Sequence, residues 1–146
     1  MAQNSFKKKL SKKHPLLAVD IIALYKNKIV LVERKNYPKG LALPGGFVNY
    51  SETVEQAAKR ELFEETNLRI KNLEQFHVYS SPKRDPRWHI VSVVLYGNAY
   101  GKLKAKSDAI GIKLIDPFGR IPKLCFDHQK ILKDFLKKVL LSSQKF

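Results

Sequence analysis

Residues 46–68, GFVNYSETVEQAAKRELFEETNL, are the stretch of the chain that decides its fold. Thr53 is a good N-cap, and Gln56 three residues later completes the capping-box pattern that begins a helix. Asn67 tolerates the left-handed backbone with which a helix commonly ends. The stretch therefore predicts a helix over residues 54–66.

The predicted helix has one face that begins apolar and ends acidic. Ala57 and Ala58 mark the face expected to pack inward, and one turn later the same face carries Glu61, Glu64 and Glu65. Carboxylates three and four residues apart repel one another, and negative charge near the end of a helix opposes the helix dipole. A divalent cation removes both conflicts, and oxygen ligands in this number suit Mg²⁺ or Mn²⁺.

An ordinary Glu-rich helix with surface salt bridges is the competing interpretation of that pattern. Arg60 lies beside the acids and is expected to hold Glu64, four residues on, as a residue supporting a metal ligand would. The wider spacing favours the metal site: Gly46, five residues, Glu52, seven residues, then RELFEETNL at residues 60–68. This spacing resembles the signature of the Nudix hydrolases, with Asn67 standing where the family has Gly.

The resemblance implies a metal site and a reaction. Glu61, Glu64 and Glu65 would hold the metal, a backbone carbonyl near Gly45 and Gly46 would complete its coordination, and Glu52 and Arg60 would support it. The expected cofactor is Mg²⁺, with Mn²⁺ as an alternative. Such a metal neutralises pyrophosphate oxygens and acidifies an attacking water, so the expected reaction is cleavage of a phosphoanhydride bond.

Strands are predicted on both sides of the helix in sequence. Apolar runs at residues 16–25 and 29–33, joined by a polar KNK turn, predict a hairpin, and further strands are expected at 70–80, 89–99 and near 112–115. Asp127 is expected to cap a final helix with an apolar stripe of Ile131, Leu132, Phe135, Val139 and Leu140. The order predicts an α/β fold, a Nudix-type α/β/α sandwich with a mixed β-sheet, as one domain over residues 15–146 behind a basic arm at 1–14.

A second resemblance concerns the substrate. The stretches at residues 14–22, 33–48, 76–95 and 126–132 are similar to the ADP-ribose pyrophosphatase branch of the family, most informatively in the loop SPKRDPR. This implies hydrolysis of ADP-ribose to AMP and ribose 5-phosphate by a homodimer. The candidate substrate contacts are Arg34, Lys35, Arg84, Arg87 and Trp88. For these residues surface charge, loop solvation or, at Trp88, packing are the alternative roles.

The general base is left open by the sequence. Relatives often carry a Glu in the loop before the last strand, whereas SDAIGIK at residues 107–113 offers only Asp108. The base is therefore Asp108 or a member of the glutamate cluster at Glu64 and Glu65. The histidines share no spacing suited to a metal and are expected to be structural.

A net charge of +15 invites a nucleic-acid interpretation, but 22 of the 28 basic residues are Lys and only 6 are Arg. Scattered lysines indicate a positive surface that attracts polyanionic substrates, so a nucleic-acid partner is not expected. No apolar run approaches the roughly 20 residues that a membrane span requires. With a single Cys125 and no signal-peptide pattern, the predicted location is the cytoplasm. The alternative functions are hydrolysis of another nucleotide or RNA 5′ end and non-catalytic sensing of ADP-ribose.

Overall fold

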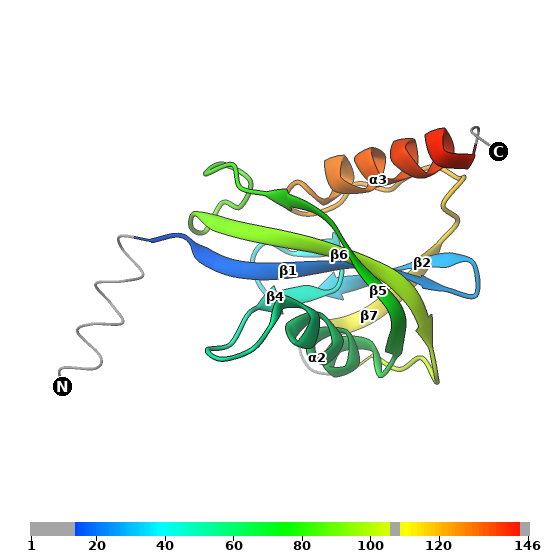
Figure 1. Ribbon diagram of the computed structural model, residues 1–146, viewed down its shortest axis with the longest axis horizontal. Helices are drawn as coiled ribbons and strands as arrows, with labels where there is room; N and C mark the ends of the chain where they lie inside the picture. The colour runs from blue at the N-terminus through cyan, green and yellow to red at the C-terminus, as the bar shows by residue number, and fades with distance from the viewer. Residues whose placement is uncertain (1–13, 106–108, 144–146) are drawn as a thin grey trace.

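The computed structural model describes residues 14–105 and 109–143. A curved sheet lies between two helices, α2 (Val54–Thr66) on one side and α3 (His128–Ser143) on the other (Figure 1). The strands are β1 (Leu16–Tyr25), β2 (Lys28–Arg34), β3 (Gly40–Ala42), β4 (Gly45–Phe47), β5 (Arg69–Tyr79), β6 (Ile90–Tyr100) and β7 (Ala109–Ile115). The predicted α/β/α sandwich is confirmed.

The sheet is mixed, as predicted. β1 runs parallel to β6 and antiparallel to β2 and β4. The hairpin of β1 and β2 is paired only at its closed end, Leu24 with Ile29 and Tyr25 with Lys28, where Lys26 and Asn27 adopt positive φ angles. Beyond that point β4 pairs with the first half of β1, and this places the Gly45–Gly46 segment in the middle of the molecule.

Helix α2 begins and ends as predicted. The Thr53 side chain accepts a hydrogen bond from the Gln56 backbone, the Gln56 side chain returns one to the Thr53 backbone, and Asn67 has a left-handed φ of 64°. Its inward face differs from the prediction, because Leu62 and Thr66 continue the buried stripe. The glutamates therefore flank the packed face, and the cluster is not itself the continuation of that face.

The apolar core lies in two layers. Ala57, Ala58 and Leu62 of α2 pack on one face of the sheet, and Ile131, Leu132 and Phe135 of α3 pack on the other. Of the predicted α3 stripe, Val139 is 42% exposed because it lies beyond the sheet-covering turns, and the side chain of Leu140 lies outside the described part of the chain. β7 is longer than predicted: it pairs with β2 as far back as Ala109, through a glycine that weakened the sequence signal.

Two parts of the sequence prediction cannot be compared with the fold. The basic arm lies almost entirely at residues 1–13, and Asp108 lies in the gap at 106–108, so both are outside the described residues. Within the residues described, neither helix has the length and apolar character needed to cross a membrane.

Candidate active site

A pocket of about 390 Å³ opens over β4 and the second half of α2. It gathers most of the side chains predicted from the sequence: Arg34, Lys35, Gly45, Gly46, Glu61, Glu64, Glu65, Arg84 and Arg87. Glu52, Arg60 and Trp88 do not line it. Residues that the sequence did not indicate also do so, among them Asp20, Glu33, Asn36, Asp85, Phe126 and His128.

Glu61 and Glu65 form a buried carboxylate pair at one end of this pocket. Glu65 Oε1 accepts a hydrogen bond of 3.2 Å from the backbone nitrogen of Gly45. Burial raises the pKa of Glu65 to about 8, and the negative charges of Glu61 and Asp20 contribute, while the Gly45 hydrogen bond opposes the rise. Burial also raises the pKa of Glu61. Two carboxylates held together out of water are an unfavourable arrangement for the chain alone.

Arg60 organises the acids from outside the pocket. Its guanidinium holds Glu52 through two hydrogen bonds of 2.7 and 2.9 Å, Glu61 at 2.8 Å and Glu64 at 3.3 Å. It also donates to the backbone oxygen of Phe47, in β4, at 2.9 Å. The hydrogen bonds from Arg60 hold the pKa of Glu52 at about 2, so Glu52 stays ionised. The predicted Arg60–Glu64 contact is present, and Glu52 and Glu61 share the same guanidinium.

The donor set fits a divalent cation at Glu61 and Glu65. Carboxylate oxygens with nearby backbone carbonyls are the ligands that Mg²⁺ and Mn²⁺ prefer, and a cation would offset the repulsion between the two acids. Gly46 leaves the necessary space, because a Cβ at this position would overlap the Glu61 carboxyl group. The set is not closed: among the described residues no three acidic, His or Cys side chains converge, and Glu64, 47% exposed, is directed toward Arg60.

The loop at residues 81–88 carries the other predicted contacts. Arg84 is 4% exposed and forms two hydrogen bonds with Asp127, at 2.7 and 2.9 Å, so its guanidinium is held by the protein. Arg87 is fixed by Asp85 through its own backbone nitrogen and two guanidinium contacts of 2.9 to 3.1 Å. Trp88 is 58% exposed and outside the pocket lining, with the Arg87 guanidinium 5.5 Å from its ring centre.

Phe126 lies where the basic residues of the pocket meet. Its ring centre is 5.0 Å from the Arg34 guanidinium and 5.2 Å from that of Arg87. Arg34 is further held by a hydrogen bond of 2.9 Å from its Nε to the backbone oxygen of Pro38. The pocket therefore has an acidic end, at α2, and a basic aromatic end, between β2 and the 81–88 loop.

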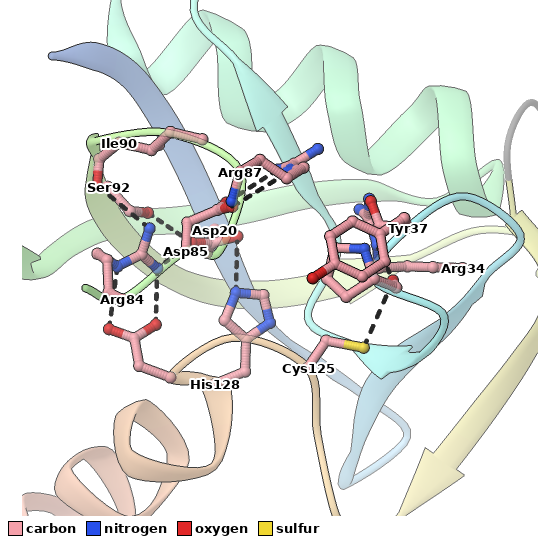
Figure 2. A network of polar contacts seen from close by, with 12 residues as sticks. Asp20, Arg34, Tyr37, Arg84, Asp85, Arg87, Ile90, Ser92, Cys125 and His128 are labelled. Atoms are coloured by element: carbon pink, nitrogen blue, oxygen red, sulfur yellow. Dashed lines mark hydrogen bonds and ion pairs between the residues drawn. The ribbon is translucent and has the colours of Figure 1, made fainter. Parts of the chain in front are cut away.

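A buried polar network lies beneath the pocket (Figure 2). Asp20 accepts hydrogen bonds from Ser92 at 2.5 Å and Arg84 at 3.4 Å, and its other oxygen lies 3.2 Å from His128 Nε2. The prediction that the histidines are structural fits His128, whose other nitrogen accepts from a backbone amide. A single acid inside the apolar run LLAVDIIALY was the sequence signal for Asp20.

An α/β/α sandwich with an arginine-braced acidic helix end above a partly basic pocket is the arrangement of a metal-dependent hydrolase of phosphate compounds. The NUDIX domain family matches residues 14–135, and the chain belongs to the Nudix family. It is 50% identical over 127 residues to the ADP-ribose pyrophosphatase of Methanocaldococcus jannaschii, covering 85% of this chain and 75% of that protein.

Two solved structures show the same fold. The NUDIX domain of Shewanella oneidensis NrtR, in complex with ADP ribose, has a TM-score of 0.76 at 25% identity, over 95% of this chain and 99% of that one. A bifunctional NMN adenylyltransferase/ADP ribose pyrophosphatase from Francisella tularensis, with AMP and a Mn ion, has a TM-score of 0.75 at 28% identity. That match covers 94% of this chain and 47% of the bifunctional one.

Proposed function

We propose that this Nudix hydrolase cleaves the pyrophosphate bond of ADP-ribose to give AMP and ribose 5-phosphate, with Mg²⁺ or Mn²⁺ as its metal. The observation that carries the proposal is the two-ended pocket, with the Glu61–Glu65 pair at one end and Arg34 and Arg87 at the other. A diphosphate diester needs both, a metal at the bond that breaks and cations along its remaining charge. The 50% identity to an ADP-ribose pyrophosphatase supports this substrate.

The residues that would hold the metal are Glu61 and Glu65, with the backbone of Gly45–Gly46 and, once turned from Arg60, Glu64. When bound, the metal neutralises pyrophosphate oxygens and lowers the pKa of an attacking water. Arg60 keeps the acids oriented from behind, through the contacts of 2.7 to 3.3 Å that it makes with them. The chain therefore supplies the ligand geometry before substrate arrives.

The proton of the attacking water needs an acceptor. Glu64 is our candidate, because it lines the pocket, is the most exposed of the three glutamates of α2 and is held only by the longest of the Arg60 contacts. Asp108 is the alternative that the sequence predicted. The two are distinguished by the variants Glu64→Gln and Asp108→Asn, of which only the one lacking the base should lose the alkaline-activated part of its pH–rate profile.

At the other end of the pocket, Arg34, Lys35 and Arg87 would contact the substrate, and Arg84 would act from below. The net charge of +15 would speed the encounter with an anionic nucleotide. By resemblance we also propose a homodimer in the cytoplasm, for which light scattering of the purified chain and its localisation in cells are the tests.

Two other functions deserve a direct comparison. Another nucleotide as substrate is the nearer alternative, and sensing of ADP-ribose is favoured by the likeness to the NrtR domain. The decisive experiment incubates the chain and Mg²⁺ with ADP-ribose, other ADP-sugars, nucleoside triphosphates and triphosphorylated RNA. We expect AMP and ribose 5-phosphate to be the fastest products. Rapid triphosphate cleavage with ADP-ribose untouched would exclude the proposal, and binding without turnover would establish a sensor.

A further inference from the structure

The polar network beneath the pocket joins segments that are far apart in the sequence. Asp20 is in β1, Arg84 in the loop between β5 and β6, Ser92 in β6, and Asp127 and His128 at the start of α3. Arg84 and His128 have side chains only 4% and 2% exposed. Within the described residues no buried side-chain nitrogen or oxygen lacks a hydrogen-bond partner. The network is therefore complete, and it fixes its members in one arrangement.

The hydrogen bonds of His128 define its tautomer. The backbone N–H of Leu43 donates to Nδ1 at 2.9 Å, so Nδ1 carries a lone pair and no hydrogen. The ring proton is then on Nε2, which faces Asp20 Oδ1 at 3.2 Å. His128 is thus a neutral ring that accepts on one side and donates on the other, and it ties the chain just before β4 to the buried acid of β1.

This bond reaches the acidic end of the pocket in two short steps. Leu43 is followed by Pro44 and Gly45, and the Pro44 oxygen accepts from the Ile21 nitrogen at 2.8 Å. Gly45 lies so close to Asp20 that a Cβ on it would be 2.6 Å from Asp20 Oδ1. The backbone nitrogen of Gly45 is the group that holds Glu65. The position of this carboxylate therefore depends on where His128 and Asp20 place β4.

Arg84 reaches the basic end. Its two bonds to Asp127 anchor the 81–88 loop to the start of α3, and its Nη2 extends on to Asp20. The next residue, Asp85, binds both the backbone and the guanidinium of Arg87. Arg87 in turn lies against Phe126, two residues before His128. The loop is consequently fixed by the same helix start that fixes β4 (Figure 2).

We propose that His128 and Arg84 are positioning residues that share Asp20: His128 sets the Gly45 segment and the acids above it, and Arg84 sets the loop that carries Arg87. The inference rests on the proposed function only in its choice of substrate. It assigns Arg84 an indirect role in place of the direct substrate contact expected from the sequence. It also predicts different kinetic effects, on kcat at the His128 side and on KM at the Arg84 side.

Two side-chain amides separate the two bonds of His128. In His128→Asn the amide oxygen can replace Nδ1 and keep the Leu43 bond, whereas in His128→Gln the amide nitrogen can replace Nε2 and keep only the Asp20 bond. We expect His128→Gln to lower kcat for ADP-ribose by about 10- to 100-fold, with KM changed less than about threefold, and His128→Asn to retain most of kcat. The matched control, His77→Gln on the exposed part of β5, should match the wild type.

Arg84→Lys tests the other side. A lysine keeps the charge but cannot make the two-pronged bond to Asp127, so the loop loses its anchor. We expect KM to rise about 10-fold or more, and the affinity for ADP-ribose measured calorimetrically without metal to fall equally, while kcat and the affinity for Mn²⁺ alone stay within about threefold. Arg69→Lys, on an exposed residue at the start of β5, is the control.

Several results would overturn the proposal. One is a ¹⁵N NMR spectrum of the wild type that shows a protonated Nδ1 on His128, a measurement that needs no variant. Another is a loss of kcat and a rise of KM in equal proportion in both His128→Gln and Arg84→Lys. Failure of the proposed function looks different: the wild type would leave ADP-ribose intact, yet its best nucleotide would still show the kcat and KM separation.

Discussion

The backbone nitrogen of Gly45 donates a hydrogen bond of 3.2 Å to Oε1 of Glu65, 20 residues further along the chain. This contact joins β4 to the last turn of α2 at the pocket. It is the strongest of the interactions that oppose the cost of burying Glu65, and it still leaves the pKa of this carboxyl at about 8. The chain therefore holds the acid in place without a partner of opposite charge, as a ligand for an added cation requires.

Glu65→Gln separates the chemistry of this residue from its structural role. The amide oxygen can still accept from Gly45, and the repulsion with Glu61 is removed. We expect kcat to fall about 100-fold or more, because a ligand of the metal is lost. The thermal midpoint measured in EDTA should equal or exceed that of the wild type. Retention of activity would mean that Glu65 does not hold the metal.

Gly46→Ala tests the space next to Glu61. A methyl group here would meet the carboxyl carbon and both oxygens of Glu61, which must then move away from the site. We expect a weaker affinity for Mn²⁺ and a loss of about 1–3 kcal/mol of stability, as overpacking typically gives. Gly119→Ala is the control, because its added Cβ meets Asp116 at an ordinary distance of 3.4 Å. Equal Mn²⁺ titrations for the two variants would show that Gly46 is not needed for the site.

Asp20 gives a prediction for the dependence of stability on pH. Burial raises the pKa of its carboxyl, but contacts with His128, Arg84 and Ser92 outweigh this and lower it to about 2, from 3.8 in the absence of structure. Because the folded value is the lower one, the stabilisation is complete above pH 3.8 and is lost as the pH falls toward 2. The shift corresponds to about 2 kcal/mol.

Denaturation by urea at several pH values checks this dependence. Asp20→Asn should be less stable than the wild type at pH 7, and the difference in unfolding free energy should narrow between pH 4 and pH 2. Asp116→Asn, on a turn at the surface, should follow the wild type throughout. A constant difference across this pH range would show that the carboxylate form of Asp20 is not what stabilises the fold.

How far the sequence predicted the structure depends on whether an interaction is local. Helix α2 follows from neighbours three and four residues apart, Thr53 with Gln56 and Arg60 with Glu64, and both contacts are present. The strands of the hairpin follow from their alternating and apolar runs for the same reason. Sequence patterns of this kind record contacts within one element.

The buried network could not be predicted in this way. Asp20 lies 64 residues from Arg84 and 72 from Ser92, and only the pairing of β1 with β6 brings them together. Arg84, read in its sequence context, is one of several charges in a polar loop, and its burial depends on the place of α3. The course of the glutamate face was predicted only in part, because the sheet and not the helix decides which side of α2 is covered.

Phe126 offers the last test, at the basic end of the pocket. Its ring contacts the guanidinium groups of both Arg34 and Arg87, at 5.0 and 5.2 Å, and each contact of this kind contributes about 0.5–1 kcal/mol at a partly exposed site. In Phe126→Leu both guanidiniums lose the surface that orients them. We expect KM for ADP-ribose to rise about fivefold or more, while kcat stays close to that of the wild type because the acids of α2 are untouched. Phe118→Leu, at a ring that is 78% exposed, controls for the change in size and should leave KM as it was. If Phe126→Leu lowered kcat and left KM unchanged, the basic end would not be where the substrate is held, and Arg34 and Arg87 would have to be reassigned.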